Sequence, residues 1–224
     1  ADKRTGATTT PVRRTRATPA TEEVGARSRH GNSVTLAPAA RERMQEARDV
    51  IEALVASGAV VYGVTTGFGD LASVSIQAVD VERLQENLLM SHAAGVGVAF
   101  PRELVRAMLL LRANTLALGH SGCRPLIVDR LIDFLGAGIH PIVPEQGSLG
   151  ASGDLAPLAH LALPLIGRGQ VEFNGAVVPA VIALRQAGLE PLGLGPEEGL
   201  APPNGPPVMG ASGAPPRPGS EPPP

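Results

Sequence analysis

Between residue 38 and residue 166, apolar side chains recur mainly three and four positions apart, the spacing of helices that bury one face. Pro38 and Pro101 suit the first turn of a helix, where no backbone N–H is needed, and Gly58 and Gly119 suit positions just past helix ends. The pattern predicts five helices, at 38–56, 80–94, 101–118, 125–136 and 154–166.

The one clear strand pattern lies at 170–178, where Asn174-Gly175 suits a two-residue hairpin turn. Strands do not alternate with helices as they do in a parallel sheet, and no segment repeats. We therefore predict a mainly α fold with a small β-hairpin near 170–178.

Both ends of the chain differ from the middle. Residues 1–30 carry seven Lys or Arg against three acids, and residues 201–224 hold ten of the 22 prolines. Neither composition favours a packed core. We expect a disordered basic arm at 1–33, an ordered domain at 34–209 and an unstructured Pro-rich tail at 210–224.

Composition narrows the function classes. Aromatic residues make up 2% of the 224 residues and the formal net charge is −2, which disfavours a nucleic-acid partner. Cys123 is the only cysteine, so an internal disulfide is excluded. No apolar run approaches the roughly 18 residues of a membrane helix. We expect a cytoplasmic protein with no membrane partner.

Standard cofactor motifs are missing. The Gly-rich loop at 62–69 lacks the Lys-Ser/Thr ending of a P-loop and the spacing of a dinucleotide fingerprint. The histidines, at positions 30, 92, 120, 140 and 160, never share the i, i+4 spacing of a helical zinc site. We expect neither a metal nor a nucleotide.

The segment 147–158 is unusual because it places Ala151-Ser152-Gly153 directly before Asp154 and an apolar helix. In one interpretation, Asp154 caps that helix and the small residues allow a tight approach. In the other, a sharp turn presses the Gly153 nitrogen against the Ala151 carbonyl carbon. Ring closure and the loss of two waters, one from the Ser152 hydroxyl, would then give an electrophilic methylidene-imidazolone.

These residues resemble the signature of the histidine and aromatic amino-acid ammonia-lyases, a family whose members build that group. Four other stretches resemble the family in the same order, at 61–69, 84–95, 112–114 and 140–148. The resemblance covers about residues 34–209. It implies the N-terminal, cofactor-bearing part of a fumarase/aspartase-like helical lyase fold.

The resemblance also implies an activity, the elimination of ammonia from L-histidine to give urocanate. The methylidene-imidazolone, formed autocatalytically from the Ala151-Ser152-Gly153 triplet, would take up the substrate amine and make it a better leaving group. Tyr62 matches the base that removes the β-proton. Asp154 would help the dehydration as well as cap the helix.

Two further positions correspond to substrate-binding residues of the family. His92 would contact the substrate ring or carboxylate, and Asn204 would hydrogen-bond the cofactor carbonyl or the substrate. Ser91-His92 is similar to histidine ammonia-lyases, but tyrosine-using relatives also carry a histidine there. A tyrosine or phenylalanine ammonia-lyase or aminomutase therefore stays open.

The sequence also departs from the family. Thr65 stands where Asn is usual, and four prolines surround Asn204. Family members are longer, and their second half supplies the tetramer core and further catalytic residues. We therefore expect an N-terminal fragment, truncated or frameshifted, that forms a homo-oligomer only at full length, or is inactive alone. A second Ala-Ser-Gly, at 211–213, lies in the Pro-rich tail and is assigned no function.

Overall fold

The computed structural model describes residues 10–12, 34–62, 64–67, 76, 80–147, 155–199 and 201–202. Within them the helices are α2 (Pro38–Ala56), α3 (Val81–His92), α4 (Arg102–Leu116), α5 (Pro125–Ala137), α6 (Leu155–Ala162) and α7 (Ala180–Gln186). All five predicted helices are present. The last becomes a 3-10 helix at Leu163–Ile166, and α7, only seven residues long, was not predicted.

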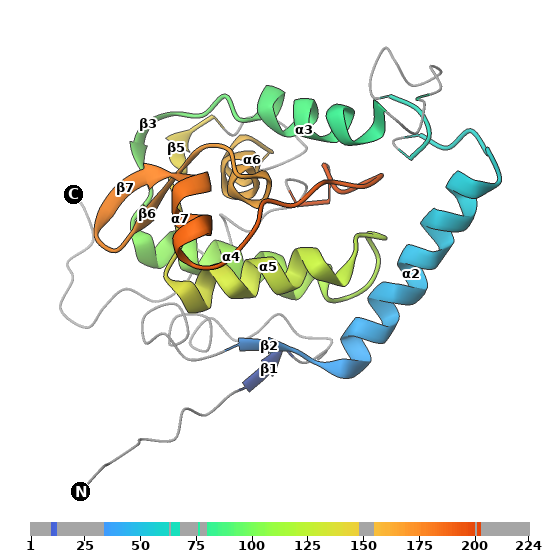
Figure 1. Ribbon diagram of the computed structural model, residues 1–224, viewed down its shortest axis with the longest axis horizontal. Coiled ribbons are helices and arrows are strands. Elements are labelled where there is room, and N and C mark those ends of the chain that lie inside the picture. The colour runs from blue at the N-terminus through green and yellow to red at the C-terminus, as the bar shows by residue number, and fades with distance from the viewer. Residues whose placement is uncertain are drawn as a thin grey trace, which may run out of the picture.

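The helices surround a core built on α4 and α5, which pack against each other. Residues 105–113 of α4 are all buried, so this helix is covered on every side. In Figure 1, α2 and the hairpin with α7 lie at opposite ends of the molecule, and α3 runs along one side. The largest fully buried side chains include Phe134, Met108, Leu109, Leu131, Leu158 and Leu161.

The hairpin is confirmed as β6 (Gln170–Phe173) and β7 (Ala176–Pro179), which pair antiparallel. Asn174 and Gly175 have φ angles of 51° and 78°, the left-handed conformation that a tight primed turn requires. A third strand, β4 (His140–Pro141), pairs with β6 and completes a small sheet.

Two further strand pairs were not predicted. β3 (Val96–Ala99) pairs antiparallel with β5 (Pro144–Gln146), and Val96 lies opposite Gln146. β1 (Thr10–Val12) pairs in parallel with β2 (Val34–Leu36). β1 falls within the arm at 1–33 that was expected to be disordered, while the rest of that arm lies outside the described residues.

Among the described residues, every helix is too short or too polar to cross a bilayer. Some charged residues of the core are hydrogen-bonded to backbone; Arg106, for example, donates to the Leu135 carbonyl at 3.1 Å. The mainly helical fold class predicted from the sequence is confirmed.

Candidate active site

Two of the predicted site residues, Tyr62 and His92, belong to the described part of the chain. The others lie outside the described residues: Ala151, Ser152, Gly153, Asp154 and Asn204. Their surroundings are known only through the segments on either side. The site is therefore built from those flanks and from the loop of Tyr62.

Tyr62 lies in the loop after α2, and Thr65 holds the turn that carries it. The Thr65 hydroxyl accepts the Val61 N–H at 2.8 Å and donates to the Ala59 carbonyl at 2.6 Å. The Thr65 N–H also donates to the Val61 carbonyl at 3.0 Å. Thr65, which stands where the family usually has Asn, thus closes the turn with its own side chain. The Tyr62 side chain is 59% exposed.

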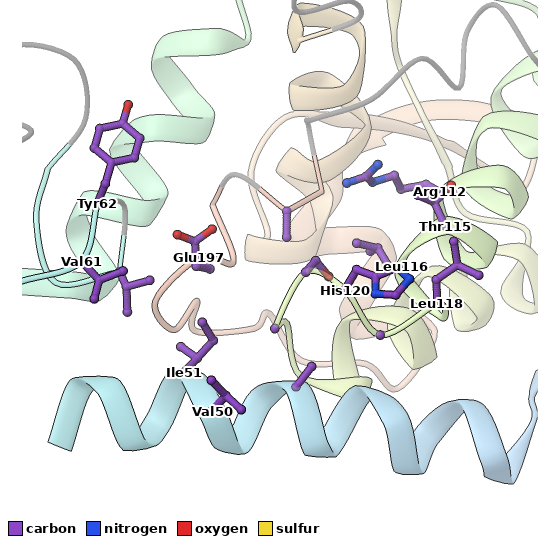
Figure 2. A pocket seen from close by; sticks show the side chains of 16 residues that line it. Val50, Ile51, Val61, Tyr62, Arg112, Thr115, Leu116, Leu118, His120 and Glu197 are labelled. Atoms are coloured by element: carbon purple, nitrogen blue, oxygen red, sulfur yellow. The ribbon is translucent and has the colours of Figure 1, made fainter. Parts of the chain in front are cut away.

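A cavity of about 760 Å³ lies between α2, the Tyr62 loop, the end of α4 and the segment 197–201. Figure 2 shows Tyr62 on one side of this cavity, Arg112 and His120 on the other, and Glu197 between them. Ile51 of α2 forms part of the apolar wall. The cavity brings Tyr62 together with residues more than a hundred positions away in sequence.

Arg112 is the buried cation of this cavity. Its side chain is 3% exposed, and no described residue accepts a hydrogen bond from its Nε. Burial lowers the pKa of Arg112 to about 10 and raises the pKa of Glu197 above its ordinary value. A buried, incompletely paired guanidinium favours an anionic group such as a carboxylate. Sequence analysis placed Arg112 in a family motif without giving it a role.

His92 ends α3 and is half-buried. Its Nδ1 lies 2.8 Å from the Leu88 carbonyl oxygen, and a carbonyl only accepts, so Nδ1 carries the proton. The Ser91 hydroxyl lies 3.2 Å from the same nitrogen. Nε2 is then the atom that can accept a hydrogen bond. His92 is not among the described residues that line the cavity of Tyr62.

The two flanks of the triplet segment meet at Gly95. The antiparallel pairing of Val96 with Gln146 brings the residue before β3 beside the residue after β5. A Cβ on Gly147 would lie 2.9 Å from the Gly95 Cα and 3.2 Å from the Ala156 Cβ. Gly147 also has φ 140°, a conformation that favours glycine. Residues 147 and 156, on either side of the triplet segment, therefore lie close together.

A buried carboxylate, Glu198, holds the segment that leads toward Asn204. It receives hydrogen bonds from the Arg124 Nε at 2.8 Å and the Gly195 N–H at 2.7 Å. One residue later, the Gly199 N–H donates to the Gln85 Oε1 of α3 at 2.7 Å. Sequence reasoning missed Glu198, because its partners are far away along the chain and nothing local marks the pairing.

Cys123 and His140 have structural surroundings. Cys123 is 1% exposed, and burial raises the pKa of its thiol. His140 is 8% exposed and accepts a hydrogen bond from the Arg106 Nη1 at 3.0 Å. Burial and the charge of Arg106 lower the pKa of His140 to about 4. Burial and these contacts are typical of structural side chains. In the described residues, no group of three or more His, Cys, Asp or Glu could hold a metal ion.

A family model described as aromatic amino acid lyase matches residues 20–215, most of the chain. The chain belongs to the aromatic amino acid lyase family. The resemblance inferred from its motifs is therefore confirmed, and so is the helical lyase fold.

Individual members of the aromatic amino acid lyase family are similar to the chain in both sequence and structure. The chain is 54% identical over 198 residues to a histidine ammonia-lyase of Geobacillus thermodenitrificans. Its structure is similar to that of the histidine ammonia-lyase from Trypanosoma cruzi, with a TM-score of 0.80 and 38% identity over 87% of this chain. It is equally similar to the tyrosine aminomutase of Streptomyces globisporus, with a TM-score of 0.79 and 39% identity over 87% of this chain.

The chain spans only part of these relatives. Its match covers 82% of this chain but 39% of the Geobacillus protein. The matches to the solved structures cover 37% of the Trypanosoma chain and 36% of the Streptomyces chain.

Proposed function

We propose that this chain is the N-terminal, cofactor-bearing part of an ammonia-lyase that converts L-histidine to urocanate. The observation that carries the proposal is the Ala151-Ser152-Gly153 triplet, set in a segment whose flanks, Gly147 and α6, meet at Gly95. The 54% identity to a histidine ammonia-lyase supports histidine as the substrate.

The triplet forms the methylidene-imidazolone by a balanced double dehydration. The Gly153 nitrogen bonds to the Ala151 carbonyl carbon, and the carbonyl oxygen leaves as water with the amide hydrogens of Gly153 and Ser152. The Ser152 hydroxyl leaves with the Cα hydrogen as the second water. The finished group supplies an electrophile for the substrate amine. Asp154 would assist the dehydration.

The other residues bind the substrate and move its proton. Tyr62, held by the Thr65 turn, accepts the β-proton of the amino acid at its phenolic oxygen. His92 presents Nε2 to the substrate, because its Nδ1–H is engaged by the Leu88 carbonyl. Arg112, buried on the wall of the cavity that Tyr62 also lines, attracts a carboxylate. Asn204 hydrogen-bonds the cofactor carbonyl or the substrate.

The complete site needs more than this chain, which spans 39% of its Geobacillus relative. We propose that turnover occurs in a cytoplasmic homotetramer of the full-length protein. The chain alone is expected to build the electrophile but not to turn over substrate.

A second candidate substrate is tyrosine, for a lyase or an aminomutase. The identity to the Streptomyces tyrosine aminomutase, 39%, is within one percentage point of the identity to the Trypanosoma histidine ammonia-lyase, 38%. The products formed from histidine and from tyrosine distinguish the two activities.

The first experiment is the intact mass of the purified chain, followed by peptide mapping across 147–160. We expect a loss equal to two waters, localised to Ala151-Ser152-Gly153 and absent from a Ser152→Ala variant. Ser212→Ala, in the second Ala-Ser-Gly, is the matched control and should leave that loss unchanged. An unmodified mass would overturn the proposal that this chain builds the group.

The second experiment tests the substrate on the full-length protein. L-Histidine and L-tyrosine are supplied in turn, and urocanate and coumarate are quantified. Urocanate as the main product, lost in a Tyr62→Phe variant, would support the proposal. Coumarate or β-tyrosine as the main product would replace histidine by tyrosine.

A further inference from the structure

We propose that His160 is a positioning residue for the dehydration of the triplet, because its ring fixes Gly95 against both flanks of the triplet segment. This inference rests on the proposed function and names a further residue on which that function depends. His160 lies on α6, the helix that begins directly after the triplet segment.

The contact is a single, well-defined hydrogen bond. The Gly95 N–H donates to the His160 Nε2 at 3.0 Å. Gly95 precedes β3, so the bond joins α6 to the loop between α3 and β3. It ties two segments that are 65 residues apart in the sequence.

The same glycine supports the other flank. A Cβ on Gly147 would approach the Gly95 Cα to 2.9 Å, closer than real Cβ contacts allow. A Cβ on Gly95 would lie 3.1 Å from the His160 Nε2 and 3.2 Å from the Gln146 carbonyl oxygen. Gly95 is thus enclosed between Gln146-Gly147 on one side and His160 on the other. If it moved, the two ends of the triplet segment would no longer be held at a fixed separation.

The chemistry of the triplet depends on that separation. Ring closure requires the Gly153 nitrogen to reach the Ala151 carbonyl carbon, and a displaced reacting group loses rate steeply. In the described structure, the contact of Gly147 with Gly95 holds the segment before the triplet, and the hydrogen bond from Gly95 to His160 holds α6 after it. His160 is the only side chain among these contacts that hydrogen-bonds Gly95.

The ring is in the protonation state that this role needs. Nε2 can accept the Gly95 N–H only when it carries no proton. Burial lowers the pKa of His160 below its ordinary value, which favours the neutral ring. α6 packs against α3 and β5, the elements next to Gly95 and Gly147.

The test compares two variants of the whole chain. His160→Gln can keep an acceptor near the Nε2 position, whereas His160→Leu has similar bulk and no acceptor. Three quantities are measured: the fraction of chain that has lost two waters over time, the hydrogen–deuterium exchange of the Gly95 amide, and the midpoint of thermal unfolding.

We expect His160→Leu to dehydrate more slowly by roughly ten- to 100-fold, the scale on which misplaced groups lose rate. Its Gly95 amide should exchange faster, while His160→Gln stays close to the unaltered chain in both measurements. A Gly95→Ala variant, which keeps the N–H but adds a methyl group against His160, should also slow dehydration. This variant keeps the test valid if His160→Leu does not fold.

The outcomes separate this inference from the proposed function. If the unaltered chain never dehydrates, the proposal that this chain builds the group fails and the inference falls with it, even where Gly95 exchange responds to His160→Leu. If the unaltered chain and His160→Leu dehydrate at the same rate, the inference alone is overturned. Equal loss in His160→Gln and His160→Leu, with unchanged Gly95 exchange, would overturn it as well.

Discussion

The carboxylate of Glu198 is fully buried and accepts hydrogen bonds from both the Nε of Arg124, at 2.8 Å, and its backbone N–H, at 2.9 Å. Arg48 of α2 approaches the same carboxylate to 3.9 Å. Burial raises the pKa of Glu198, but hydrogen bonds from Arg124 and Gly195 outweigh it and hold the pKa below its usual value. One side chain thus joins α2, the start of α5 and the segment leading to Asn204.

Glu198→Gln should destabilise the fold strongly, because it leaves the Arg124 guanidinium without its carboxylate partner. Removing one partner of a buried pair costs about 3–5 kcal/mol, and the free energy of unfolding in urea measures it. The control is Asp129→Asn, which breaks the exposed pair with Arg41 and should cost at most about 1 kcal/mol. Equal losses of unfolding free energy in the two variants would show that Glu198 does not stabilise the fold more than an exposed ion pair does.

Gly122→Ala should destabilise more than Gly58→Ala. Both glycines have positive φ, 65° and 68°, so an alanine at either position costs about 1–2 kcal/mol. At Gly122, however, a Cβ would lie 2.5 Å from the Ile51 Cγ1, whereas nothing lies within 4 Å at Gly58. The difference between the two melting temperatures therefore isolates the clash. Adding Ile51→Ala should reduce the extra loss at Gly122, and an unchanged loss would contradict the contact.

Stability should fall between pH 6.5 and pH 4 because of His140. Its folded-state pKa of about 4 lies below the ordinary 6.5. Between these two pH values the unfolded chain is protonated at His140 and the folded chain is not. The free energy of unfolding then rises with pH across this window. We expect a loss of about 2 kcal/mol on acidification, given that the pKa shift is equivalent to 1.36 kcal/mol per unit before screening.

Unfolding in urea at pH 4.5, 5.5 and 7 measures this dependence, and His140→Gln should flatten it. His160, whose pKa burial also lowers, contributes in the same direction and remains in the variant. An identical pH slope in both proteins would exclude His140 as the source.

Cys123 should be unreactive in the folded chain. Its side chain is 1% exposed and burial raises its pKa, so little thiolate is available to a thiol reagent at pH 7. We expect the cysteine to react only after urea is added, at a rate that follows unfolding. Rapid modification without denaturant would mean that the packing around α5 opens.

The sequence determined the elements that depend on local patterns. The helices α2 and α5, the position of Pro38 at the start of α2, and the Asn174-Gly175 turn were predicted correctly. These features are set by interactions within a few residues, so the sequence shows them directly. The triplet and its framing motifs likewise carried the family, which the match at 20–215 confirmed.

The tertiary structure alone decided which distant segments meet. β3 and β5 are short and have exposed or half-buried residues, so their pairing depends on the contact between chain segments rather than on a local hydrophobic pattern. That pairing places Gly95 beside Gly147. In the same way, Glu198 pairs with Arg124, which lies 74 residues away in the sequence. A hydrogen bond or ion pair of that separation leaves no periodic trace in the sequence, because its energy depends on three-dimensional proximity that only the folded chain creates.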